Sequence, residues 1–150
     1  PVRVNLDVYI WPGSKRHPKS YDEDVLEANR ILKPTGVELN LRKCKFEGRT
    51  QPGKNLADNN SPVVKFIANL PEEIQVHVVP TLQSNGETLH GWRSRGAVLL
   101  ADSGNGQTLA HELGHYFGIL HDEHNFGYLM NEKAETGANL TQQDIIDFRK

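Results

Sequence analysis

The sequence predicts an α+β fold in which a twisted mixed sheet is backed by helices. Segments with apolar residues at every second position alternate along the chain with segments of helical character. After about residue 118 the chain becomes mostly irregular and ends in one closing helix. The length of 150 residues suits a single domain. Such a chain can bury roughly 70% of the surface that it exposes when unfolded, so it needs no disulfide bonds to fold.

The first part of the chain predicts two strands around one helix. Apolar and polar residues alternate over 2–10, which predicts a strand with one buried face. Prolines and glycine then predict a loop over 12–18. A helix of about three turns is expected from Asp22 to Leu32, with acidic residues in its first turn, where the helix dipole favours them. Apolar residues at 37, 39 and 41 predict the second strand.

The middle and end of the chain predict two more strands and three helices. A polar stretch over 47–60 predicts a long surface loop, and a short helix is expected over 61–69. Strands are expected at 74–79 and 97–101, separated by a loop with the turn signal Asn85-Gly86. A glycine-rich turn at 104–106 precedes a helix over about 107–117. A closing helix over 141–149 is expected to begin with a capping box of Thr141 and Asp144.

Composition excludes several classes of function. Seventeen basic residues against nineteen acidic ones give a net charge of −2, so the chain lacks the basic surface typical of nucleic-acid binding. Its apolar runs are far shorter than the ~20 residues of a membrane-spanning helix. The only cysteine is Cys44, which excludes an intramolecular disulfide. Because the chain begins with Pro1, we expect that an upstream segment was removed. We also expect a secreted or extracytoplasmic protein, and a monomer.

The chemistry is concentrated in residues 111–121, which read HELGHYFGILH. His111 and His115 are four residues apart, so on a helix both project from one face and can share a metal ion. Gly118 stands where the helix is expected to end, which lets the chain turn and bring His121 back as a third ligand. Three imidazoles leave one position open for water, as in a catalytic zinc site. Glu112 is placed to accept a proton from that water.

This segment resembles the HExxHxxGxxH signature of the metzincin clan of zinc metalloendopeptidases. Nine residues after the third histidine, Leu129-Met130-Asn131 looks like the methionine turn of that clan. The resemblance implies one catalytic Zn²⁺, hydrolysis of internal bonds of protein or peptide substrates, and Met130 and Gly118 as structural support of the metal site. It also implies an upper subdomain over 1–118 and a lower subdomain over 119–150.

The resemblance further implies where a substrate lies. The strand over Gly96–Ala101 is expected to form the upper rim of the cleft and to pair with the substrate as an added strand. Gly96, Ala97 and Val98 are therefore the predicted substrate-binding residues. Asp122 resembles the adamalysin pattern, whereas Glu132 stands where an astacin has its tyrosine ligand.

Several alternatives remain open at this stage. His124 can replace His121 as the third ligand, and His77 on an apolar strand is more often a core histidine. His90 and Trp92 lie near the expected cleft rim. The residues over 102–106 favour a turn over a calcium site, so calcium binding stays undecided. The chain can also be a zinc-bearing but catalytically silent binding module, or a structural zinc domain with a fourth protein ligand.

Overall fold

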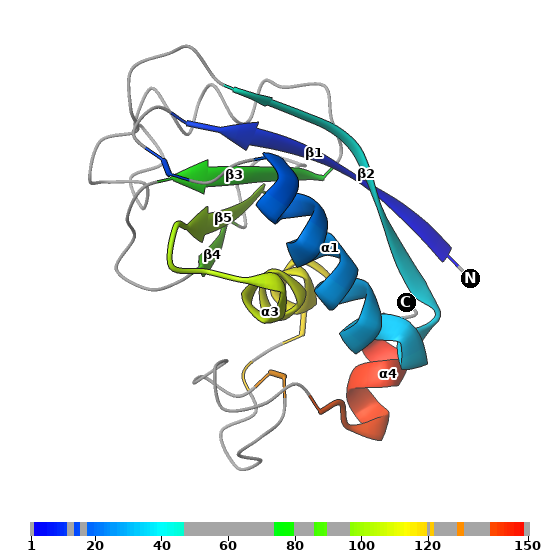
Figure 1. Cartoon of the computed structure of the whole chain (residues 1–150). Coiled ribbons are helices and arrows are strands. Elements are labelled where there is room, and N and C mark those ends of the chain that lie inside the picture. Colours follow the sequence, from blue (N-terminus) through cyan, green and yellow to red (C-terminus); the bar gives the residue numbers. More distant parts are fainter. Residues whose placement is uncertain are drawn as a thin grey trace.

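A computed structural model describes residues 2–11, 14–15, 18–46, 74–79, 86–89, 97–119, 121, 129–130 and 139–148. Within these ranges the helices and strands are drawn in Figure 1. Their order is β1 (Val2–Ile10), α1 (Pro18–Leu32), a 3-10 helix (Lys33–Thr35), β2 (Val37–Phe46), β3 (Gln75–Val79), β4 (Gly86–Leu89), β5 (Ala97–Ala101), α3 (Gly106–Tyr116) and α4 (Gln142–Phe148). The loop predicted over 47–60 and the helix predicted over 61–69 lie outside the described residues.

The five strands form one mixed sheet in the order β2-β1-β3-β5-β4. Neighbouring strands run parallel except β4, which lies antiparallel to β5. The predicted α+β class is therefore confirmed. The prediction of a loop at residues 86–89 is wrong, because pairing with β5 makes a strand of a segment too short to have a recognisable apolar period.

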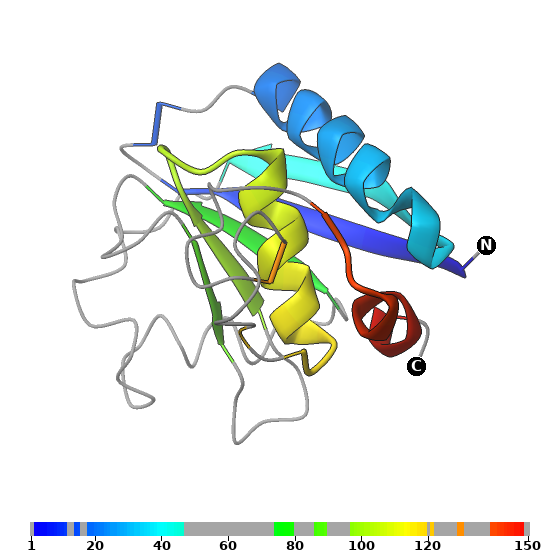
Figure 2. The same ribbon diagram turned by 90° about the horizontal axis from the view of Figure 1, so that it is seen from below.

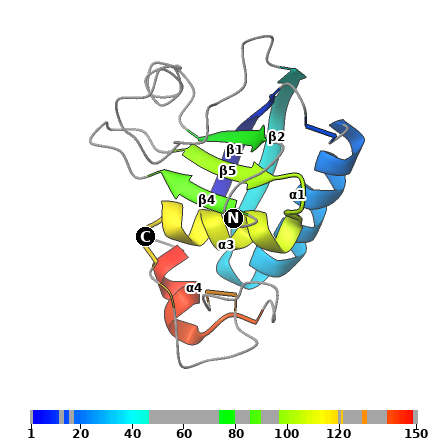
Figure 3. The ribbon, with the colours of Figure 1, turned by 90° about the vertical axis from the view of Figure 1, so that its left-hand side faces the viewer.

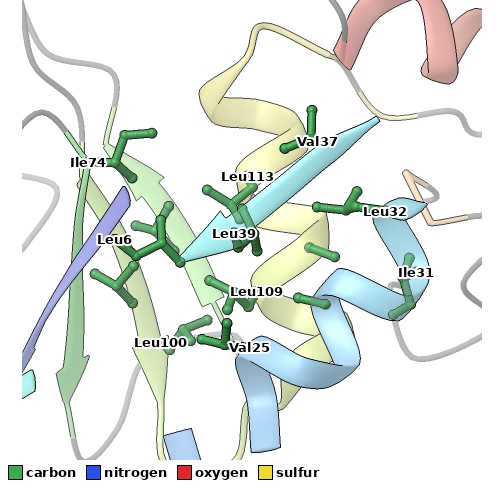
Figure 4. Packing of buried hydrophobic residues seen from close by; sticks show 14 of the residues in the cluster. Leu6, Val25, Ile31, Leu32, Val37, Leu39, Ile74, Leu100, Leu109 and Leu113 are labelled. Atoms are coloured by element: carbon green, nitrogen blue, oxygen red, sulfur yellow. The ribbon is translucent and has the colours of Figure 1, made fainter. Parts of the chain in front are cut away.

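Helices α1 and α3 pack on each other and on the same face of the sheet, as Figures 1 and 2 show. Helix α1 begins at Pro18, four residues earlier than predicted, since proline is tolerated in the first turn of a helix. The core between helices and sheet is aliphatic (Figure 4). It includes Leu6, Val25, Leu39, Leu100, Leu109 and Leu113. Each such buried side chain contributes roughly 1.5–3 kcal/mol to folding, so α3 is firmly attached to the sheet.

Helix α4 supports α3 from the side away from β4, as Figure 3 shows. The Phe148 ring of α4 contacts the Phe117 ring at a centroid distance of 5.9 Å. The predicted capping box of α4 is confirmed: Thr141 N–H donates to the Asp144 carboxylate, and Asp144 N–H donates to the Thr141 hydroxyl, both at 3.0 Å. In the part of the chain that the structure describes, every helix is too short or too polar to cross a bilayer.

The other face of the sheet is buried along β3, β5 and the second half of β1, and it holds a polar chain centred on His77. The indole Nε1–H of Trp11 donates to His77 Nδ1 at 2.8 Å. The His77 proton therefore lies on Nε2, which donates to Gln75 Oε1 at 3.0 Å. The Tyr9 ring stacks on the imidazole at a centroid distance of 5.1 Å. His77 is a core histidine, as the strand pattern predicts. Because both faces of the second half of β1 are buried, the expectation of one buried face is wrong there.

A β-bulge in β2 places Arg42 beside a buried carboxylate. The pairing register with β1 shifts between Leu6 and Asp7, which leaves Arg42 as the extra residue. Asp7 is buried, and Arg42 donates to both of its carboxylate oxygens, through Nε to Oδ1 at 2.9 Å and through the terminal nitrogen to Oδ2.

Replacing Arg42 by methionine is expected to lower the free energy of unfolding by about 2 kcal/mol, because a buried carboxylate loses its charged donor while the apolar stem remains. Urea denaturation checks this value. Arg3→Met is the matched control, since Arg3 forms an exposed pair with Glu38 at 3.8 Å and such pairs contribute little. Equal losses in both variants would contradict the role of the bulge.

Cys44 lies half-buried on β2. Burial raises the pKa of its thiol, and the carboxylate of Asp22 raises it further. Since only the thiolate reacts, native protein is expected to react with iodoacetamide several-fold more slowly at neutral pH than the protein in urea, and the native rate should rise with pH. Mass spectrometry of timed samples measures both rates. Equal native and denatured rates at neutral pH would argue against a raised pKa.

Candidate metal centre

Helix α3 presents two histidines four residues apart, as the sequence predicts. The N-cap of the helix is Asn105, whose side chain accepts from Thr108 N–H at 3.1 Å, while Thr108 Oγ1 accepts from Asn105 N–H at 3.2 Å. This capping box fixes where the helical register starts. One turn later His111 and His115 project from the same face, with ring centroids 4.7 Å apart.

Gly118 ends the helix as predicted, with a positive φ of 91°. Gly118 N–H donates to the His115 carbonyl and Ile119 N–H donates to the Gly114 carbonyl, both at 2.9 Å. These two bonds form a Schellman motif, which reverses the chain and satisfies the last carbonyls of α3. The reversal brings His121 back to the two helical histidines.

Replacing Gly118 by alanine is expected to lower the free energy of unfolding by roughly 1–2 kcal/mol, because a side chain disfavours this left-handed conformation. The space around an added Cβ is open, so the loss is conformational rather than steric. Gly118→Asn is the matched control, since asparagine tolerates the left-handed region better and should lose less. Thermal unfolding of both variants measures the difference; an asparagine variant no more stable than the alanine variant would contradict the explanation.

The three histidine side chains converge on one point. His115 Nε2 lies 3.1 Å from His111 Nε2 and 2.9 Å from His121 Nε2. The three potential ligand atoms all lie within 4.8 Å of one another, and they form the group able to hold a metal ion among the described residues. In tetrahedral zinc sites, bonds of about 2.0–2.1 Å put neighbouring nitrogens roughly 3.3 Å apart, which is close to both observed separations. The three histidines could therefore hold one ion, with His111 buried and His121 exposed.

Backbone carbonyls determine the tautomers of the two helical histidines. His111 Nδ1 lies 2.6 Å from the Leu129 carbonyl, and His115 Nδ1 lies 2.7 Å from the Ile119 carbonyl. A carbonyl only accepts, so in the neutral rings both protons lie on Nδ1 and both Nε2 atoms carry lone pairs. Two lone pairs facing each other at 3.1 Å repel unless a cation lies between them. The donor set thus fits a metal ion, and carbonyls behind the histidines are typical of metal sites.

Electrostatics favour the metal-binding form of His115. Burial lowers the pKa of His115, and the neighbouring His111 and His121 lower it further. The bond to the Ile119 carbonyl and the negative charge of Glu112 oppose this shift. A lowered pKa keeps the imidazole neutral at neutral pH, which is the form that binds a metal.

Glu112 and Met130 lie next to the histidines. Glu112 is only 6% exposed, and its charge acts on His115, yet it is not part of the three-histidine group. Met130 is fully buried, with its sulfur close to the backbone of α3 at Gly114. The preceding residue, Leu129, donates its N–H to the Asn139 carbonyl at 2.7 Å, which ties this turn to the chain before α4.

The structure corrects the prediction for the substrate strand. Ala97 and Val98 are fully buried, and β5 pairs with β3 on one side and with β4 on the other. A strand bonded on both edges cannot accept another, so a substrate cannot pair with β5. Within the described part of the sheet, β4 forms the edge next to α3.

The structure describes only some of the remaining residues that the sequence singled out. The predicted residues Gly96, His90, Trp92, Asp122, His124 and Glu132 lie outside the described residues. Residues 102 and 103 form the expected turn, which Gly104 N–H closes by donating to the Ala101 carbonyl at 2.9 Å, and Gly106 already belongs to α3. Asp102 accepts from the Ser14 hydroxyl and from Lys15 N–H. Sequence reasoning missed the Leu129 and Ile119 carbonyls, because a backbone acceptor has no residue-type signature.

Comparisons with known proteins support the fold. No family model matches the chain, and no curated protein matches it by sequence. Among solved structures, metalloproteinase-II from Bacteroides fragilis is similar, with a TM-score of 0.69 and 13% identity over 99% of this chain and 52% of that one. A chain from a chaperone–substrate complex is similar over 98% of this chain and 33% of its own length, with a TM-score of 0.64 and 13% identity. The chain thus spans about half of the first of these structures and a third of the second, and it shares their fold over nearly its whole length.

Proposed function

We propose that this chain is a zinc-dependent endopeptidase of the metzincin type. The observation that carries the proposal is the convergence of three imidazole nitrogens, two of them on rings whose opposite nitrogen bonds to a carbonyl. His111, His115 and His121 would hold the ion, and Met130 and Gly118 would support them. The likeness in fold to a metalloproteinase agrees with this. The upper part would comprise residues 1–118 and the lower part 119–150.

Each group then has a defined chemical task. Zinc, when bound, would activate a water molecule and polarise the peptide carbonyl. The Glu112 carboxylate accepts the proton that the attacking water loses, and it can donate that proton to the leaving amine as the carbon–nitrogen bond breaks. Glu112 is buried and follows His111 directly on α3, which suits this role.

A protein or peptide substrate would bind as an extended strand along β4. Within the described part of the sheet this strand is the edge next to α3, and an edge strand can offer its outer backbone groups to an added strand. Recognition through the backbone tolerates many substrate sequences, which suits an endopeptidase. The silent binding module is the alternative that the experiment must exclude.

The test is cleavage of a proteome-derived peptide library by purified protein. We expect internal cleavage that a zinc chelator abolishes and that added Zn²⁺ restores, with one zinc per chain by elemental analysis. Zinc binding without cleavage would identify the silent binding module. A protein that binds no zinc would contradict the metal centre itself.

A further inference from the structure

Gly114 lies on α3 between Glu112 and His115, and the structure leaves no room there for a side chain. A Cβ atom at this position would lie closest to Met130 Sδ, with Met130 Cε at 2.8 Å and Phe148 Cζ at 3.3 Å. Real Cβ contacts below 3.0 Å are essentially never seen, so even one methyl group would force a neighbour to move. The backbone of α3 and the thioether of Met130 are therefore in direct contact.

The end of a methionine side chain is flexible, but here it is enclosed. Met130 is fully buried, and it belongs to the same core cluster as Leu109, Leu113 and Phe148. Phe148 is itself held against Phe117. Interiors are packed at crystal-like density, so a displaced sulfur atom would meet other core side chains. An added methyl group would therefore push the turn that carries Met130 away from α3.

The turn that carries Met130 also supplies the backbone carbonyl that accepts a hydrogen bond from His111 of the metal centre. Leu129 precedes Met130, and its carbonyl lies 2.6 Å from His111 Nδ1. Moving the turn away from α3 would lengthen this hydrogen bond, and the His111 ring would no longer be held in its orientation. We propose that Gly114 is a positioning residue: its missing side chain lets Met130 lie against α3, and this contact holds the Leu129 carbonyl at His111. The inference rests on the metal centre of the proposed function.

The test is Gly114→Ala, with zinc affinity measured by chelator competition and the site geometry measured by the visible absorption of the Co²⁺-loaded protein. We expect zinc affinity to fall about 10- to 100-fold, as it does when a group behind a ligand is lost. We also expect the Co²⁺ spectrum to change in position and intensity, which a loss of stability alone would not produce.

Gly106 provides the matched control on the same helix. Gly106 is the first residue of α3, five residues before His111. A Cβ there would lie 2.6 Å from both the Asp24 carbonyl oxygen and Glu27 Cβ of α1. Gly106→Ala should therefore lower the melting temperature but leave zinc affinity and the Co²⁺ spectrum unchanged. Gly114→Ala with unchanged affinity and spectrum would overturn the proposal, however much its melting temperature fell.

A second substitution tests the cause. Met130→Ala removes both atoms that the methyl group added by Gly114→Ala would meet most closely. Combining the two substitutions should therefore restore zinc affinity to that of Met130→Ala alone. This comparison holds even when Gly114→Ala itself does not fold. A double variant that binds no better than Gly114→Ala, or clearly worse than Met130→Ala, would overturn the proposal.

Zinc binding by the parent chain is measured first. If the parent chain binds no zinc, both the metal centre and this inference are wrong. If the parent chain binds zinc, the variants test the role of Gly114 alone.

Discussion

Replacing Glu112 by glutamine is expected to reduce the rate of peptide cleavage by about 100- to 10,000-fold, the range that general acid–base catalysis contributes. Glutamine keeps the size of the side chain but cannot accept a proton. Because Glu112 stands outside the three-histidine group, the variant should still bind one zinc ion. Its fold should persist as well, since the substitution is nearly isosteric.

Initial rates on one cleavable peptide, together with zinc content, measure both parts of this result. Glu38→Gln is the matched control, because Glu38 is an exposed carboxylate on β2, away from α3, and should leave the rate unchanged. A Glu112→Gln variant with the parental rate would assign the proton transfer to another group. A variant that loses its zinc would instead make Glu112 part of the metal-binding set.

The second large effect is expected at His121. Replacing His121 by alanine should weaken zinc binding more than about 100-fold, because losing a ligand exceeds the 10- to 100-fold effect of losing a group behind one. The Nε2 atom of His121 lies 2.9 Å from that of His115, where a shared ion would bind both. Cleavage should fall in proportion to the bound zinc.

His124→Ala is the direct control for this prediction, since His124 is the alternative third ligand in the sequence. It should keep parental zinc affinity and activity. Chelator competition on both variants decides between the two histidines. The reverse pattern, with loss only in His124→Ala, would move the third ligand to the later position.

The sequence predicted the histidine cluster well because its determinants are local. His111 and His115 are related by the period of one helix, and Gly118 ends that helix through its own backbone conformation. Neither relation needs information from distant segments. The capping box of Thr141 and Asp144 was predictable for the same reason.

The features that sequence reasoning missed depend on contacts between distant segments. Strand β4 exists because β5 pairs with it, and the Leu129 carbonyl reaches His111 from 18 residues away. The close packing at Gly114 involves Met130 and Phe148, and no periodicity in the sequence connects these residues with Gly114. The error about the substrate strand has the same origin, since strand order within a sheet is not encoded in the pattern of any one strand.

The hydrogen bond from Leu129 to Asn139 makes the candidate metal centre independent of the length of the chain between them. It closes the chain on either side of residues 131–138, so the carbonyl behind His111 is anchored independently of what lies between. Lengthening such a closed segment twofold costs only about 0.6 kcal/mol in chain entropy. Insertions there should thus leave the three-histidine cluster intact, so this stretch can vary in length without cost to the candidate metal centre.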